Sequence, residues 1–104
     1  MREEKDSMGK ILVPDDVYYG AQTQRAVENF QISDRRIPKT LIRSLGIIKK
    51  SAAITNYKLK KINFKTKNAI VKSCNEIISG KHDNQFVVDI FQTGSGTSTN
   101  MNTN

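Results

Sequence analysis

The stretch PKTLIRSLGIIKKSAAITNY, Pro38–Tyr57, decides the fold of this chain. Apolar and small side chains recur in it at i, i+4, i+7, i+11 and i+14, which is the spacing of one helix face. These positions are Leu41, Leu45, Ile48, Ala52 and Thr55, widened by Ile42. Basic side chains fall outside this stripe, at Lys39, Arg43, Lys49 and Lys50. Pro38 suits a first helical turn, where its missing N–H is not needed. The pattern predicts a helix over about 38–57. Without further helices to pack against, the stripe from Leu41 to Thr55 is expected to be exposed apolar surface.

A second helix is predicted over 64–79, after the turn KLKKINFK. Asn63 or Thr66 can cap its start, and Gly80 suits its C-terminal stop. Its apolar side is marked by Ile70, Cys74, Ile77 and Ile78. These neighbours favour a buried packing role for the cysteine over a nucleophilic one. Two amphipathic helices joined by a short loop form an αα-hairpin.

The N-terminal stretch MREEKDSMGKILVPDD suggests an extended arm or a short hairpin, with ILVP as its β-like part. Asp15 or Asp16 is placed to cap the next segment, DVYYGAQTQRAVENF, which is predicted to be partly helical. The apolar run Phe86–Phe91 fits either a buried helical turn or a strand. The fold class predicted is therefore mainly α, with a small N-terminal β element.

Size and charge limit the possible functions. The 104 residues suffice for one small domain, and a single cysteine excludes a disulfide framework and a metal site built on several thiolates. The net charge is +7, with twelve Lys and Arg and no Asp or Glu from Arg35 to Lys72. This basic stretch fits a nucleic-acid footprint, a field that attracts anionic metabolites, or solvated helix faces. Because aromatic residues are not interleaved with it, we favour solvated faces.

The uncharged stretch QTGSGTSTNMNTN, Gln92–Asn104, carries the chemistry. Ser95 and Thr97 supply hydroxyls, and the neighbouring glycines let backbone N–H groups approach a ligand closely. From Thr99 onward the spacing could open a helix, whose N-terminus attracts anions. The stretch therefore suits a carboxylate or phosphate held by neutral donors, although a flexible linker has the same composition. His82 is expected to be a solvated loop residue rather than a catalytic imidazole.

QTGSGTSTNMN resembles the signature of the class II fumarase and aspartase superfamily. EKDSMG, VPDDVYYGAQTQRAVENF, SLGIIKKSAA and GKHDNQFVVDIFQTGSGTSTNMNTN follow in the order expected of its N-terminal domain. DSMG, GAQTQR and QTGSGT resemble fumarase, whereas many aspartases have His in place of Gln22 and GAGT in place of residues 94–97. Some aspartases, however, also carry Gln at the position of Gln22, and the stretch SLGIIKKSAA resembles some aspartases as well. Aspartase, which eliminates ammonia, stays the alternative.

The resemblance implies roles for particular residues. Ser95, Gly96 and Thr97 would contact a substrate carboxylate, and Asn100 would lie beside the site. Gln92 and Thr93 would shape the loop. Possible support of the cleft falls to Thr23 and Arg25. The implied reaction is the reversible trans addition of water to fumarate, which gives (S)-malate in the tricarboxylic acid cycle. No catalytic residue, metal or organic cofactor is expected within this chain.

The resemblance also implies the setting of the chain. Residues 1–104 would be the N-terminal, lyase 1-type domain, truncated before the central helical domain. The parent would be a homotetramer whose sites draw on three subunits, so the fragment alone would be inactive. A small dicarboxylate is the expected partner, with neither nucleic acid nor membrane. No signal-peptide core or membrane-length run is present, which favours the cytoplasm, with an organelle matrix as the alternative. A basic helical nucleic-acid-binding module and an inert structural fragment are the other hypotheses.

Overall fold

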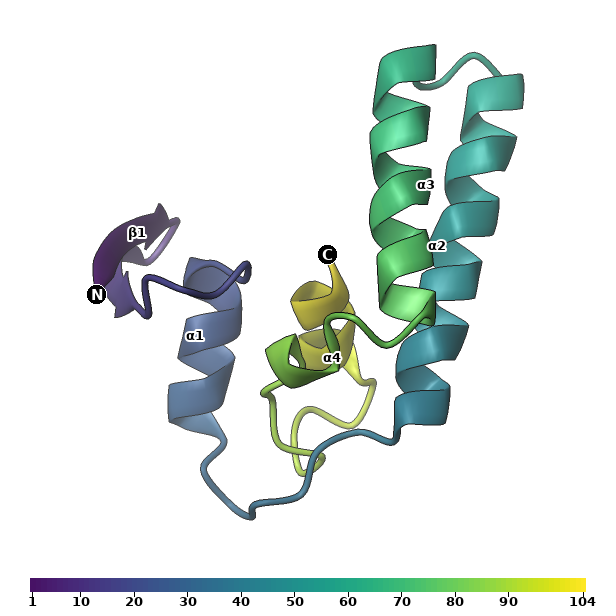
Figure 1. Cartoon of the computed structure of the whole chain (residues 1–104). Helices are drawn as coiled ribbons and strands as arrows, with labels where there is room; N and C mark the ends of the chain where they lie inside the picture. The colour runs from purple at the N-terminus through teal and green to yellow at the C-terminus, as the bar shows by residue number, and fades with distance from the viewer. The chain divides into compact units, whose positions relative to one another are not determined.

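The computed structural model describes residues 1–104 and is mainly helical with one short β-hairpin, as predicted (Figure 1). The chain divides into two compact units. The hairpin unit is Pro38–Asp83, and the loop unit combines Met1–Ile37 with Asn84–Asn104. None of the helices combines the length and the apolar character needed to cross a membrane.

The hairpin unit consists of α2, Lys39–Lys58, and α3, Phe64–Ile78, which pack along each other (Figure 1). Both helices match the predicted ranges within one residue, and the predicted αα-hairpin is confirmed. Pro38 stands just before the first turn rather than in it, because its ψ of 144° is extended. Its carbonyl accepts hydrogen bonds from the N–H groups of Leu41 at 3.0 Å and Ile42 at 3.2 Å.

The buried face of α2 coincides with the predicted stripe only at Ile42. Its buried residues are Ile42, Gly46 and Ala53, whereas Leu41 is 44% and Ile48 62% exposed, in line with the expectation of an exposed stripe. The face that packs on α3 is rotated by about one residue from the stripe. The physical reason is Gly46: a Cβ there would lie 3.0 Å from Cγ1 of Ile78, so the bare backbone forms the contact with α3. Apolar periodicity does not register a glycine as a core position.

The ends of the hairpin helices confirm the predicted punctuation. The side chain of Asn63 accepts the N–H of Thr66 at 2.7 Å and so caps α3. Gly80 adopts φ +87° after α3, the left-handed conformation of a helix stop. Lys60 takes the same conformation after α2, at φ +59°, without being a glycine. Cys74 is buried and reduced, as predicted, and burial raises the pKa of its thiol.

The loop unit begins with an antiparallel β-hairpin of β1, Arg2–Asp6, and β2, Gly9–Val13, which settles the choice between arm and hairpin. Helix α1, Ala21–Asn29, follows. Neither Asp15 nor Asp16 caps it, because α1 begins only after Gly20 and has no side-chain cap. Asp15 instead pairs with the N-terminal amine at 2.9 Å.

The second part of the loop unit, Asn84–Asn104, holds the polar stretch. A short 3-10 helix, η1, Asp83–Gln85, begins at the last residue of the hairpin unit and leads into it, and α4 covers Thr97–Thr103. Between them, Phe86–Phe91 forms neither of the predicted regular structures. It makes one isolated bridge, between Arg36 and Asp89, and buries Phe86 and Val88. This irregular anchored segment leads directly into the predicted binding loop.

Candidate functional site

The predicted binding loop is a turn that opens a helix. The N–H of Gly96 donates to the carbonyl of Thr93 at 3.0 Å, which closes the turn. Gly96 then adopts φ +72° and serves as the N-cap of α4. The prediction that a helix opens in this stretch is confirmed, although α4 already begins at Thr97. A left-handed residue at this point explains why glycine is needed there.

The two hydroxyls of the loop lie together. Ser95 Oγ and Thr97 Oγ1 are 2.7 Å apart, and both residues are exposed. A Cβ added at Gly94 or at Gly96 would meet nothing within 4 Å, so space is open beside the backbone. At this distance one hydroxyl donates to the other, so the pair presents one uncommitted hydroxyl donor on an accessible turn. Such a donor can hydrogen-bond to an anionic oxygen without introducing a full positive charge.

Asn100 lies one helical turn beyond the loop. Its N–H donates to the carbonyl of Gly96 at 3.2 Å, which ties it to the loop through the first turn of α4. Asn100 is exposed on the surface of α4. The structure therefore places all four predicted substrate-binding residues within one turn and one helix start. Their contact with a substrate stays a prediction.

Gln92 lies just before the loop and joins its two ends through hydrogen bonds to Thr99. Its side-chain carbonyl accepts the N–H of Thr99 at 2.9 Å, while its amide donates to Thr99 Oγ1 and to the carbonyl of Asp89, both at 2.8 Å. Because the N-cap Gly96 has no side chain, Gln92 takes over the capping of a first-turn N–H of α4. This geometry fits the prediction that Gln92 shapes the loop.

Asp89 was not predicted as part of the site. It is buried, with 2% of its surface exposed, and its carboxylate accepts the N–H groups of Ile32 at 3.2 Å and Phe91 at 2.9 Å. Ser33 donates to the same carboxylate through both its N–H and its hydroxyl. Burial acts to raise the pKa of Asp89, but these hydrogen bonds outweigh it and lower the pKa below its usual value. The available signal in the sequence was one acidic residue inside the apolar run VVDIF.

Thr23 and Arg25 lie on α1, away from the loop in sequence. Thr23 is buried. Arg25 donates to the Asp6 carboxylate at 2.8 Å and to the carbonyl of Gly9 at 3.1 Å, so it fastens the β-hairpin to α1. The hydrogen bond from Arg25 holds the pKa of Asp6 below its usual value. A bracing role for Arg25 is thus visible, while support of a substrate cleft stays a prediction for both residues.

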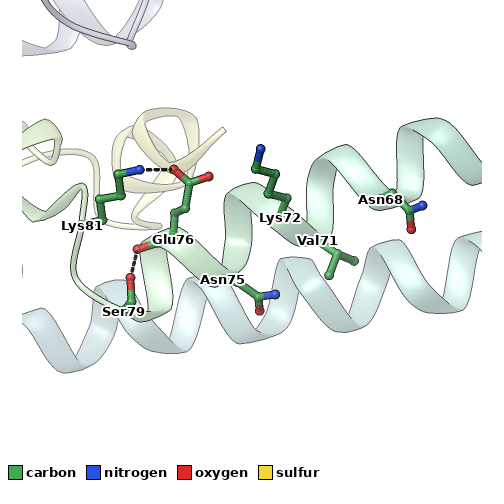
Figure 2. A pocket seen from close by; sticks show the side chains of 7 residues that line it. All are labelled: Asn68, Val71, Lys72, Asn75, Glu76, Ser79 and Lys81. Carbon is green, nitrogen blue, oxygen red and sulfur yellow. Dashed lines mark hydrogen bonds and ion pairs between the residues drawn. The ribbon is translucent and has the colours of Figure 1, made fainter.

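His82 is a loop residue, as predicted, but it is paired rather than solvated. Its Nε2 lies 3.1 Å from Glu76 Oε1, and Lys81 Nζ lies 3.1 Å from the same oxygen. Figure 2 shows the Lys81–Glu76 pair at one end of a shallow hollow on the outer side of α3. The hollow is lined by Asn68, Val71, Lys72, Asn75, Glu76, Ser79 and Lys81. The carboxylate in this hollow, Glu76, is paired with Lys81. No group of three His, Cys, Asp or Glu side chains in the chain could hold a metal ion.

The basic stretch has an aromatic pair at the tip of the hairpin unit that the sequence analysis did not recognise. The rings of Tyr57 and Phe64 lie 5.8 Å apart, and Lys67 Nζ lies 5.0 Å and 4.8 Å from their centres. These are cation–π distances within the chain. The premise that no aromatic residue is interleaved with the basic stretch is wrong at this point, because lysines stand between Tyr57 and Phe64 in the sequence. Both rings contact Lys67 of the same hairpin.

Comparison with known proteins gives consistent matches across the chain. The sequence model of a family described as Lyase matches residues 9–104. A relative from Prochlorococcus marinus subsp. pastoris, named fumarate hydratase class II, is 56% identical over 103 residues, covering 99% of this chain and 22% of the relative. A Bacillus relative, named aspartate ammonia-lyase, is 50% identical over 104 residues, covering 100% of this chain and 22% of its own length.

Solved structures agree with these matches. The crystal structure of a recombinant class II fumarase from Schistosoma mansoni superposes with a TM-score of 0.94 and 51% identity. This superposition covers 98% of the chain and 22% of the fumarase. The predicted fold class is thereby confirmed. The chain spans less than a quarter of the length of these relatives.

Proposed function

This chain belongs to the lyase family, and we propose that it is the N-terminal part of a class II fumarate hydratase. The parent enzyme would catalyse the reversible hydration of fumarate to (S)-malate, as in the tricarboxylic acid cycle. The observation that carries the proposal is the 56% identity to a relative named fumarate hydratase class II, over 99% of this chain. The open hydroxyl-bearing turn supports it as a place for a dicarboxylate.

In the proposed site, the loop binds one substrate carboxylate. Ser95 and Thr97 would donate through their hydroxyls, Gly96 would let the carboxylate approach the backbone, and Asn100 would donate from α4. The two hydroxyls are hydrogen-bonded to each other at 2.7 Å, and an arriving carboxylate would replace that bond so that each hydroxyl donates to one of its oxygens. No catalytic residue of the reaction is assigned within this chain.

Uncharged donors fit the chemistry of this reaction. In the malate direction, a base removes a proton from the carbon beside one carboxylate, which then becomes an aci-carboxylate dianion before hydroxide leaves. Preorganised hydrogen-bond donors stabilise charge that develops in the transition state. They also hold the carbons between the two carboxylates in place. Neither a metal nor an organic cofactor is required of these residues.

The setting of the site extends the proposal. Residues 1–104 would form the N-terminal domain of a homotetramer in the cytoplasm, or alternatively in an organelle matrix, with the remaining site residues supplied from outside this chain. The chain alone would therefore be inactive. The exposed apolar residues of α2, among them Ile47 at 53% and Ile48 at 62%, are consistent with further packing partners. Neither nucleic acid nor a membrane is among the proposed partners.

Aspartate ammonia-lyase activity is the second candidate, because a Bacillus relative of that name is 50% identical. The two candidates can be separated by grafting. Residues 1–104 would replace the matching segment of the Prochlorococcus fumarate hydratase and, separately, of the Bacillus aspartate ammonia-lyase. Fumarate formation from malate and from aspartate would be followed by absorbance, beside the chain alone.

We expect the fumarate hydratase graft to turn over malate, with the aspartate ammonia-lyase graft markedly impaired on aspartate. The reverse pattern would establish the second candidate. A folded fumarate hydratase graft with no malate turnover would overturn the proposed function. Malate turnover by the chain alone would contradict the expectation that it is inactive by itself.

A further inference from the structure

The predicted binding loop contains little that could hold its own shape. Within it, one backbone hydrogen bond joins Gly96 to Thr93, and one hydroxyl pair joins Ser95 to Thr97. Gly94 and Gly96 have open space where a Cβ would stand, so neighbouring atoms do not restrain them there. A glycine-rich turn loses much conformational entropy when it is fixed. Its geometry must therefore be set by the residues that flank it.

The flanking residues form a continuous polar network. Gln92, just before the loop, makes all three of its hydrogen bonds to groups on either side: two to Thr99 in α4 and one to the carbonyl of Asp89. The bonds to Thr99 join the two ends of the loop directly. Because Thr99 is 8% exposed, these bonds are shielded from competing water.

Asp89 links the hydrogen bonds of Gln92 to the connector, which is the irregular segment of residues 30–37 that follows α1. Its carboxylate accepts hydrogen bonds from Ile32, Ser33 and Phe91, and all the donors are neutral. A buried carboxylate without a paired cation is stable only if its hydrogen bonds are kept. This side chain thus joins residues 30–37 to the segment before the loop, beside the backbone bridge between Arg36 and Asp89.

We propose that Asp89 and Gln92 are positioning residues, which hold the Thr93–Ser98 loop in the geometry that receives a substrate carboxylate. The inference rests on the proposed function for its substrate and on the hydrogen bonds above for its structural part. Neither residue is assigned a contact with substrate. Gln92 fixes the distance between the two ends of the loop, and Asp89 fixes the segment from which Gln92 acts.

The structural part is tested on the 104-residue chain itself by amide hydrogen exchange. Gln92→Met keeps similar size but removes all three hydrogen bonds, whereas Gln92→Glu still accepts the Thr99 N–H. At about fivefold per lost hydrogen bond, we expect exchange of the hydrogen-bonded Thr99 amide to rise about 100-fold in Gln92→Met and less in Gln92→Glu, with that of Gly96 rising in the same direction. The matched control is Gln31→Met, at an exposed glutamine with one hydrogen bond to the Glu28 carbonyl.

The amide of buried Ala26 in α1 is the internal reference for general loss of stability, because α1 belongs to the same unit as the loop. If exchange there rises as much as at Gly96 and Thr99, Gln92 stabilises the unit without positioning the loop, and the proposal is overturned.

Asp89→Asn tests the second residue, because its amide would confront the N–H donors of Ser33 and Phe91. Faster exchange must then reach the amides of Gly96 and Thr99; an effect confined to residues 30–37 would remove Asp89 from the proposal.

The functional part uses the fumarate hydratase graft. Gln92→Glu is expected to raise KM for malate about fivefold or more, with a smaller effect in Gln31→Glu. An active graft with unchanged KM, despite a loosened loop, would show that this geometry does not matter for the carboxylate. An inactive unsubstituted graft would count against the proposed function alone, because the exchange experiment decides the structural part without turnover.

Discussion

Gly46 offers a direct test of how the hairpin unit is packed. A Cβ at this position would lie 3.0 Å from Ile78 Cγ1, 3.2 Å from Ile77 Cγ2 and 3.4 Å from the backbone oxygen of Cys74. Optimal carbon contacts are about 3.5–4.0 Å, so the two isoleucine side chains would have to move, whereas 3.4 Å to the Cys74 oxygen is an ordinary contact. The side chains cannot move easily, because both are β-branched and stiff at χ1.

The magnitude of Gly46→Ala follows from two opposing terms. Replacing glycine by alanine inside a helix gains about 1 kcal/mol of intrinsic propensity. Overpacking a close contact by one methyl costs about 1–3 kcal/mol. We therefore expect a net loss of about 1 kcal/mol in the free energy of unfolding. A urea m-value of about 1–2 kcal/mol/M converts this loss to a midpoint that falls by about 0.5–1 M.

The assay is urea unfolding of the whole chain, followed by helical circular dichroism. Ala52→Gly is the matched control, because Ala52 is exposed on the same helix and its substitution should lose only the propensity of about 1 kcal/mol. If Gly46→Ala instead raised stability by as much as Ala52→Gly lowers it, the close approach of α2 and α3 would be refuted.

Three further predictions concern single residues. Lys60→Gly should raise the free energy of unfolding by up to about 1 kcal/mol in urea titrations, because Lys60 holds a left-handed conformation at φ +59°, and a loss of stability would contradict this account. The pKa of Asp6 is lowered in the folded chain, so its contribution is complete above about pH 4 and is lost as pH falls through the folded pKa. The stability difference between wild type and Asp6→Asn should therefore shrink below pH 4, as measured by urea midpoints from pH 2.5 to 7. A difference that stays constant with pH would exclude this linkage. Asp34→Asn, at an exposed carboxylate, is the control. In the fumarate hydratase graft, Ser95→Ala should raise KM for malate about tenfold, or about 1.4 kcal/mol, without lowering stability, and Ser51→Ala should change neither; an unchanged KM would remove Ser95 from the binding loop.

Local sequence signals predicted the elements of the hairpin unit well. Its two helices depend on periodicity and on end signals such as Asn63 and Gly80, which act within a few residues of where they stand. The face that each helix buries depends on its partner. A glycine at position 46 outweighs the larger side chains of the stripe because it permits a backbone approach, and no pattern of apolar residues encodes that. The rotation of the buried face of α2 away from the apolar stripe follows from this contact.

The loop unit shows the opposite balance. Ser95 and Thr97 could be selected from the sequence because glycines and hydroxyls stand side by side, and Gln92 could be named from the family resemblance, yet Asp89 could not be predicted. Asp89 receives its donors from Ile32 and Ser33, more than fifty positions earlier, as the separations of 57 and 56 show. Its chemical character changes with burial, since the same carboxylate on a surface would need no such donors. The predicted binding loop, made of small residues, therefore takes its shape from buried polar groups, one of which bonds to residues distant in sequence. Substitutions at those groups should alter the site before substitutions in the apolar core do.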